Sequence, residues 1–242
     1  MLGKVGVKIK NDKEIADKIF ITGFHGVGYV GWISIRHIVK SLDARRIGFV
    51  YTPYMTPYVS MGKGIVTPYE IYCTENLVIF VPNVPLSSKE ITELPMKLAE
   101  FMVQKGIKEA VLIGGLDSRV SDDKFKVKYA ATSVYLKTKK DSLKQFKIGK
   151  IEDYFYIVGP LAVMLSMFEI LEFPAITLLP YANVTRPDPR AATEAIKMLN
   201  KLLNLNIDVK DLLEEEERIE REVKEIEERF KRAYGESKML YV

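Results

Sequence analysis

Short apolar runs alternate with helical patterns along this chain, and that alternation limits the fold more than any other feature. The apolar runs are rich in β-branched and aromatic residues, which is typical of strands buried on both faces. We therefore expect an α/β fold with a mostly parallel sheet flanked by helices. The runs are KIFIT (18–22), RIGFVY (46–51), NLVIFVPNV (76–84), EAVLIGG (109–115) and PAITLLPY (174–181).

Residues typical of helix ends accompany the helical patterns. Ser87 or Ser88 is expected to cap the start of one helix, and Gly106 its end. Asp188 is expected to cap another helix, with Pro189 in its first turn. The segments expected to be helical are 28–42, 87–106, 159–172 and 188–204.

The segment 52–75 breaks the alternation by repeating Thr-Pro-Tyr. Because proline cannot donate to a strand ladder, we expect edge pieces or a hairpin here rather than a central strand, with Gly62 and Gly64 at the turn. Its tyrosines and methionines suit a contact surface. An irregular edge packed on its own core is an equal alternative.

Residues 208–234 predict a long, highly charged helix with a narrow apolar heptad seam. The seam suits either a coiled coil with another subunit or packing on the parent domain. We favour the subunit contact, because the other faces are too polar for burial. The expected organisation is an α/β core at 1–207, this helix at 208–234 and a flexible tail at 235–242. The seam residues are Leu212, Ile219, Val223, Ile226, Phe230 and Ala233.

The run GVGYVG (26–31) has the G-x-G-x-x-G spacing of a dinucleotide site, between a predicted strand and a predicted helix. Such a site also needs an acidic residue at the end of the next strand, to hold the ribose hydroxyls. That strand ends in FVYTPYM without one, and no phosphate-loop lysine follows the glycines. We therefore expect no bound cofactor. The glycines are better explained by a tight turn at Gly23, Gly26 and Gly28, with Gly31 allowing close helix packing.

A ligand cleft remains an alternative at the carboxyl edge of the sheet, where α/β proteins usually bind small molecules. Its candidate residues are His25, Gly26, Gly28 and Asp117. A catalytic set of His25, Asp117 and Ser118 is conceivable, but no Gly-x-Ser-x-Gly elbow exists. The plainer interpretation makes His25 a loop residue and Asp117 with Ser118 a turn cap.

Composition excludes several classes of function. The net charge is +4 with both signs mixed along the chain, so no nucleic-acid surface is expected. One cysteine and two histidines make a metal site unexpected, and Cys73 suits inert packing. We expect a cytoplasmic protein, because no apolar run is typical of a secretory signal or a membrane span. Abundant Lys, Glu, Arg and Ile with few glutamines indicate a thermophile.

The chain ends in Leu240, Tyr241 and Val242, after a short spacer that follows Gly235. This hydrophobic–tyrosine–any pattern is a compact anchor: the leucine and the tyrosine ring bury apolar area. The terminal carboxylate can pair with a lysine or with backbone N–H groups in a pocket. It is similar to the docking tails of regulators of the proteasome core particle, although such a tail can also fold back on its own domain.

Taken together, the chain resembles the proteasome assembly chaperone 2 family in its archaeal branch. The resemblance covers most of the chain and lies in the order and spacing of several segments. It implies an α/β core similar to phosphorylase/hydrolase-like folds, no known enzyme activity, and a homo-oligomer, either a tetramer or a pentamer. The matching segments are ITGFHGVGYVGWISIRHIV, AVLIGGLDS, YIVGPLAVMLSMFEILEFPAITLLPYA and DPRAATEAIKMLNKLLNLNIDVKDLLEE.

Three functions follow as hypotheses. The first is an oligomeric proteasome assembly chaperone or ATP-independent activator, which docks Leu240, Tyr241 and Val242 in pockets of the core-particle α-ring. The second is a nucleotide- or small-molecule-binding enzyme that uses the 26–31 turn and the cleft beside it. The third is a structural homo-oligomer or an adaptor whose tails are masked.

Overall fold

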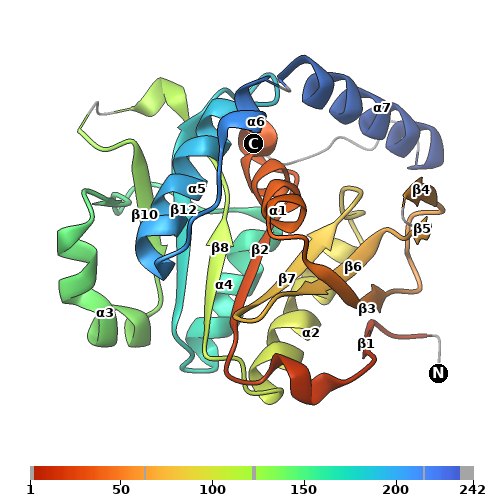
Figure 1. Cartoon of the computed structure of the whole chain (residues 1–242), viewed down its shortest axis with the longest axis horizontal. Helices are drawn as coiled ribbons and strands as arrows, with labels where there is room; N and C mark the ends of the chain where they lie inside the picture. The colour runs from red at the N-terminus through yellow and green to blue at the C-terminus, as the bar shows by residue number, and fades with distance from the viewer. Residues whose placement is uncertain (1–2, 63, 122–123, 215, 235–242) are drawn as a thin grey trace.

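One mixed sheet runs through the centre of the molecule (Figure 1). The computed structural model describes residues 3–62, 64–121, 124–214 and 216–234. In spatial order the strands are β1 (Gly6–Ile9), β3 (Arg45–Tyr51), β6 (Tyr69–Cys73), β7 (Leu77–Pro82), β2 (Ile19–Gly23), β8 (Glu109–Ile113), β12 (Ala175–Ala182), β10 (Val127–Ala131) and β11 (Gly149–Lys150). The short β9 (Leu116–Asp117) pairs with the end of β12.

The expected α/β fold is confirmed, and its parallel part is the centre of the sheet. β7, β2, β8 and β12 are parallel neighbours. Antiparallel pairs flank them, β6 with β7 on one side and β10 with β12 on the other. The carboxyl ends of the four central strands therefore meet at one edge, where the turn after β2 also lies.

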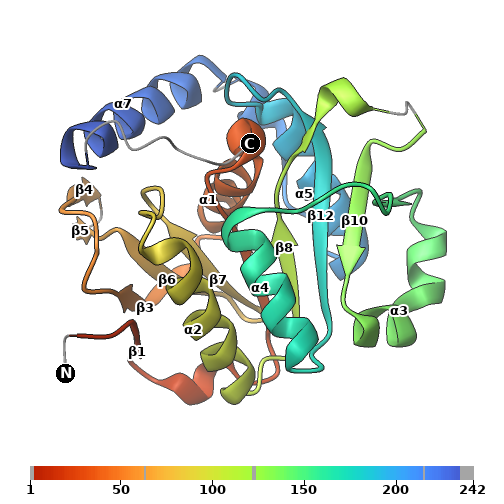
Figure 2. The same cartoon turned by 180° about the vertical axis from the view of Figure 1, so that it is seen from behind.

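Helices cover both faces of the sheet (Figures 1 and 2). One face carries α1 (Val30–Ser41) and α5 (Pro189–Leu203), and the other carries α2 (Glu90–Gln104) and α4 (Gly159–Ile170). α3 (Ser133–Gln145) lies beside β10 at the margin. Alternate strand residues divide between the two cores. Ile21, Ile79 and Val111 lie in the α1/α5 core, and Phe20, Phe80 and Leu112 in the α2/α4 core.

The predicted helix ends are partly confirmed. Asp188 caps α5, since its carboxylate accepts a hydrogen bond from the Ala191 amide. Gly106 follows α2 with a positive φ of 77°, as expected of a glycine at a helix end. The predicted serine cap of α2 is wrong, because Lys89 is the residue at the N-cap of this helix. The amide and hydroxyl of Ser87 instead donate to the Glu90 carboxylate. No helix within the described ranges is both long and apolar enough to cross a membrane.

The segment 52–75 differs in part from the expectation. Its hairpin is confirmed as β4 (Ser60–Gly62) paired with β5 (Gly64–Val66), and Gly62 lies opposite Gly64. The exclusion of a central strand is wrong, because β6 lies inside the sheet between β3 and β7. Pro68 lies just before the first residue of β6, so its missing N–H removes no hydrogen bond between β6 and its neighbouring strands. Its carbonyl accepts from the Asn83 amide at 2.7 Å.

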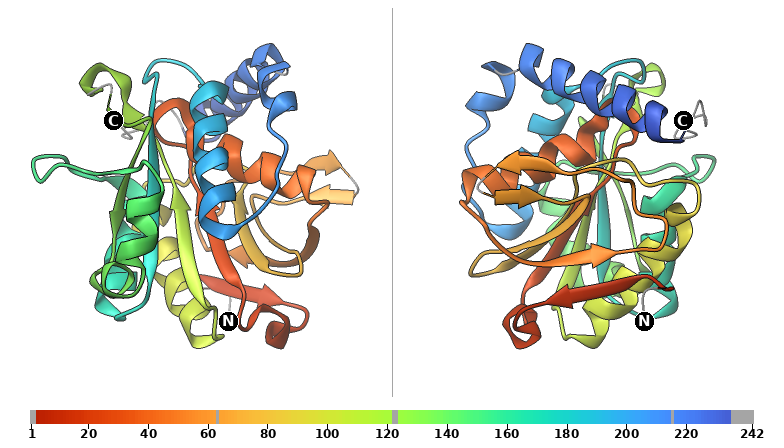
Figure 3. Two further views of the ribbon diagram at one scale, coloured as in Figure 1. Left: turned by 60° about the vertical axis from the view of Figure 1, so that its left-hand side comes forward. Right: turned by 90° about the vertical axis from the view of Figure 1, so that its right-hand side faces the viewer.

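The charged C-terminal segment forms α6 (Lys210–Glu214) and α7 (Glu216–Tyr234), and both pack on their own domain (Figure 3). The favoured subunit contact through the seam is therefore wrong. α7 lies over α1, and its second half faces the loop 56–59. A seam one side chain wide suffices for this packing, while the polar faces stay in solvent. The exposed fraction is at most 8% for Leu212, Ile219, Val223, Ile226 and Phe230.

The seam predicts how α7 responds to a buried charge. We expect Val223→Asp to release α7 from the domain, because a carboxylate would be buried without a partner at a free-energy cost of about 2 kcal/mol or more. Hydrogen exchange should then accelerate across 216–234 and stay slow in β2 and β8. Lys224→Asp, one position along on the exposed face, is the matched control. Protection of α7 that depends on protein concentration would contradict packing within one chain.

Candidate functional site at the glycine turn

The glycines of the turn between β2 and α1 meet a packing constraint. A Cβ at Gly31 would lie 2.4 Å from the Ile113 carbonyl oxygen, and one at Gly23 would lie 2.5 Å from the Gly31 Cα. Gly28 has a positive φ of 58°, and its Cβ would lie 2.9 Å from that of Ala182. These contacts confirm the structural interpretation of Gly23, Gly28 and Gly31. Gly26 differs, because a Cβ there meets no atom within 4 Å.

The topology around the turn does not fit a dinucleotide. In such a site the helix after the glycines leads to the neighbouring parallel strand, whose acidic end reaches the ribose. Here α1 leads to β3, and both β6 and β7 separate β3 from β2. The end of β3 therefore lies away from the glycines, whichever residue stands there.

Asp188 ties the turn to the start of α5. One carboxylate oxygen accepts from the Asn183 amide at 2.9 Å, and the other accepts from the Ala191 amide at 2.9 Å. Its own amide donates to the Gly28 carbonyl at 2.8 Å. The capping prediction found Asp188, but the link to Gly28 depends on tertiary contact and had no sequence signal.

His25 is buried inside an aromatic cluster. Its ring lies 5.1 Å from Trp32 and 5.9 Å edge-on from Tyr29, measured between centroids. Burial, with a smaller contribution from Arg36, lowers the pKa of His25 from 6.5 to about 3, so the ring is neutral near pH 7. Its Nε2 has no hydrogen-bond partner among the described residues.

Asp117 serves its own turn. Its carboxylate accepts from the Arg119 amide at 2.9 Å and from the Arg119 side chain at 2.5–3.0 Å. These bonds lower the pKa of Asp117 below its ordinary value. The predicted turn cap at Asp117 is therefore confirmed. The conceivable catalytic set of His25, Asp117 and Ser118 is not formed through His25 Nε2, because this atom accepts no hydrogen bond from, and donates none to, the described residues.

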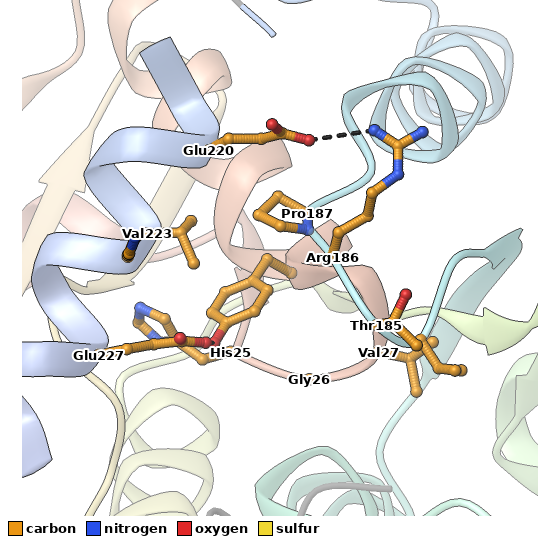
Figure 4. A pocket seen from close by; sticks show the side chains of 12 residues that line it. His25, Gly26, Val27, Thr185, Arg186, Pro187, Glu220, Val223 and Glu227 are labelled. Carbon is orange, nitrogen blue, oxygen red and sulfur yellow. Dashed lines mark hydrogen bonds and ion pairs between the residues drawn. The ribbon is translucent and has the colours of Figure 1, made fainter. Parts of the chain in front are cut away.

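Two cavities adjoin the turn and share His25, Gly26, Val27 and Val184. The smaller, of about 280 Å³, lies at the ends of β2 and β8 and is mainly apolar; Asp117 also lines it. The larger, of about 480 Å³, lies beneath α7 (Figure 4). The predicted cleft residues His25, Gly26 and Asp117 thus come together, whereas Gly28 is covered by its neighbours.

Polar contacts attach α7 to the wall of the larger cavity. Arg186 donates to Glu220 at 3.0 Å, which is the dashed line in Figure 4. The Tyr29 hydroxyl donates to the Glu227 carboxylate. Burial and that carboxylate raise the pKa of Tyr29, so the phenol stays protonated. Sequence reasoning missed this wall, because its residues are far apart in the chain.

Cys73 and the tail residues are the remaining candidates from the sequence. Cys73 is buried, accepts from Lys18 Nζ at 3.2 Å and donates to the Thr74 carbonyl, which fits inert packing. Across the described ranges no three His, Cys, Asp or Glu side chains are placed to hold a metal ion. The tail residues Leu240, Tyr241 and Val242 lie outside the described residues.

Comparison with known proteins decides the family. The PAC2 family model matches residues 20–227. The chain belongs to the PAC2 family. An uncharacterised protein of Methanocaldococcus jannaschii is 27% identical over 229 residues, which cover 94% of this chain and 93% of the relative.

Solved structures agree with this assignment. PbaA of Pyrococcus furiosus, described as an archaeal homologue of proteasome-assembly chaperone, aligns with a TM-score of 0.83 and 26% identity, over 95% of this chain and 99% of its own. PbaB of the same organism, described as an archaeal proteasome activator, aligns with a TM-score of 0.76 and 24% identity, over 94% and 100%. PbaB therefore shows the same fold.

The glycine contacts predict unequal effects of two alanine substitutions. Gly31→Ala should lower the free energy of unfolding by about 2 kcal/mol or more, because its Cβ overlaps the Ile113 carbonyl. Gly26→Ala, in the same turn, should change it by less than about 0.5 kcal/mol, because the space is open. Urea unfolding measures both. Equal losses would refute this division of roles.

The buried neutral histidine predicts acid sensitivity. The pKa of His25 is lower in the folded state than in the unfolded state, so the unfolded state gains the proton first as pH falls below 6.5. The contribution of His25 to the free energy of unfolding is therefore fully present above pH 6.5 and is lost as the pH falls toward 3. The loss between pH 7 and pH 5 is roughly 2 kcal/mol. His25→Phe, which keeps a ring in the stack, should lose that much less over this range in urea unfolding. Parallel losses in both proteins would contradict a buried neutral His25.

Proposed function

We propose that this chain is an oligomeric, non-enzymatic partner of the proteasome core particle, acting as an assembly chaperone or an ATP-independent activator. The observation that carries the proposal is the terminal Leu240-Tyr241-Val242 in a member of the PAC2 family. The likeness to PbaA and PbaB supports it, given how those two proteins are described. In this role the protein works in the cytoplasm and needs no cofactor, membrane or nucleic acid.

The tail supplies the contact with the α-ring. Leu240 and Tyr241 bury apolar area in a pocket, and the terminal carboxylate pairs with a lysine or backbone N–H groups there. Eight residues follow Tyr234, and an extended segment of that length spans at most about 28 Å. The surface around the end of α7 is therefore the part of the protein that faces the core particle.

A homo-oligomer makes such short tails effective. One tail buries little surface, so each contact is weak. A tetramer or pentamer presents several tails at once, and the first contact raises the effective concentration of the others. Tails that bind the open α-ring gate better than the closed one shift the gate toward opening. ATP is not required for this, since no phosphate-loop lysine follows the glycine turn.

The proposal is tested with purified archaeal core particles. The full chain should bind them and should change peptide hydrolysis, whereas deletion of 240–242 or Tyr241→Ala should lower binding at least tenfold through lost avidity. Binding is measured by co-sedimentation or native mass spectrometry. Native mass spectrometry of the free protein also gives the subunit number.

A control separates the tail from the rest of the chain. Ser237→Ala lies in the spacer and should bind like the unchanged protein, and all variants should keep the same oligomer. Unchanged binding by the truncated protein would overturn tail docking. Protection of the tail from carboxypeptidase in the free oligomer, without any core-particle binding, would favour a structural oligomer or adaptor with masked tails.

A further inference from the structure

We infer that the smaller cavity, between the glycine turn and the loop 151–158, is a binding site for a small, uncharged and mainly apolar molecule. This goes beyond core-particle docking, because the described residues that line the cavity come from the α/β core and none comes from the described part of α7. The inference depends on the walls of the cavity, the charge of its lining, one glycine and the exposed apolar side chains beside it.

The walls are apolar side chains from several parts of the fold. The volume of about 280 Å³ is close to the lower end of the range for ligand sites and suits a molecule the size of a substituted aromatic ring. The cavity lies at the carboxyl ends of parallel strands, where α/β folds commonly bind ligands. Side chains that line it include Phe24, Ile113, Leu116, Phe155, Leu161 and Leu179.

The charge of the lining excludes anions. Asp117 is the only side chain with a formal charge among the described residues that line the cavity, and His25 is neutral near pH 7. A phosphate or carboxylate placed here would lose its hydration without meeting a cation in the wall. The site therefore favours uncharged molecules over nucleotides, and it disfavours the chain's own terminal carboxylate.

His25 adds no charge to these apolar walls. Only 5% of the residue is exposed, and its Nε2 is itself buried. Burial lowers the pKa of His25 to about 3, so its ring lines the cavity in the neutral form near pH 7.

Gly26 leaves the space of the cavity open. Its backbone is extended, with φ of −128°, so other residues can occupy the position. An added Cβ would meet no atom within 4 Å, and Gly26 lines both cavities. A long side chain at Gly26 therefore has open space beside the cavities and need not displace the fold, unlike one at Gly28 or Gly31.

Exposed apolar side chains mark the mouth. Tyr156 is 86% exposed and Val158 is 52% exposed, and both line the cavity. They follow β11 in the loop that leads to α4. A ligand seated below them would cover apolar surface that is otherwise in water.

The test uses benzamide as the uncharged probe and benzoate as its anionic counterpart of nearly equal size. Full-length protein with labelled Ile, Leu and Val methyl groups is titrated with each probe and followed by NMR. Benzamide should shift the methyl signals of Ile113, Leu161 and Leu179 saturably, with a Kd on the order of 1 mM for so small a molecule. Benzoate should bind at least tenfold more weakly.

Two glycine variants locate the site. Gly26→Leu should abolish the benzamide shifts while the remaining methyl spectrum stays folded. Gly3→Leu adds the same side chain at a glycine whose Cβ also meets no atom within 4 Å, and should leave the shifts unchanged. Neither arm contains core particles, so failure of tail docking would not affect the result.

Several outcomes would overturn the inference. Absence of saturable shifts with benzamide would show that the cavity is not a site. Shifts that persist in Gly26→Leu would place binding elsewhere, and equal affinity for benzoate would refute the charge argument. Cavity methyl signals that move on deletion of 240–242 alone would identify the tail as the occupant instead.

Discussion

The close approach of α1 to the centre of the sheet is the constraint on which the rest of the structure depends. The helix touches β2 and β8 through Gly31, where even a methyl group would overlap the Ile113 carbonyl. To enter the helix at that depth the chain turns through Gly28 and Tyr29 in left-handed conformations. That turn buries His25 against Trp32, presents the Gly28 carbonyl to Asp188, and leaves open space at Gly26. The G-x-G-x-x-G spacing, which suggests a nucleotide site, therefore serves the packing of α1 on the sheet, and the turn that it forms lines two cavities.

α7 shows how little apolar surface is needed to hold a charged helix. Its seam is one side chain wide and is buried against its own domain, while Lys224, Glu225 and Glu228 stay exposed. Exposed ion pairs add little stability, so the apolar seam provides most of the attachment. α7 forms one wall of the larger cavity and precedes the tail in the sequence.

Prediction from the sequence succeeded where local pattern and burial agree. The central strands β2, β7, β8 and β12 are apolar on both faces, and the helical patterns of α1, α2, α4 and α5 lie between such runs, so both were predicted. β10 and α3 were not predicted, because the sequence of β10, VKYAA, contains a lysine and two alanines and forms no β-branched apolar run, and α3 is mainly polar. β6 was misassigned because nearby prolines mark the segment as an edge, although Pro68 lies just outside the ladder. The apolar seam of α7 was predicted correctly. The surface that covers it was predicted wrongly, because a heptad pattern does not specify whether another subunit or the same domain packs against it.

The sequence by itself determined the α/β class, the family, the capping by Asp188 and the identity of the terminal motif, because each is written in residues close together in the chain. Only the tertiary structure decided that the glycines serve packing, since the overlap with Ile113 joins segments about eighty residues apart. It also decided that α1 leads to a distant strand, which removes the dinucleotide geometry. The cavity beside His25 was also decided only by the tertiary structure, because its walls come from strands, loops and a helix that meet only in the folded chain.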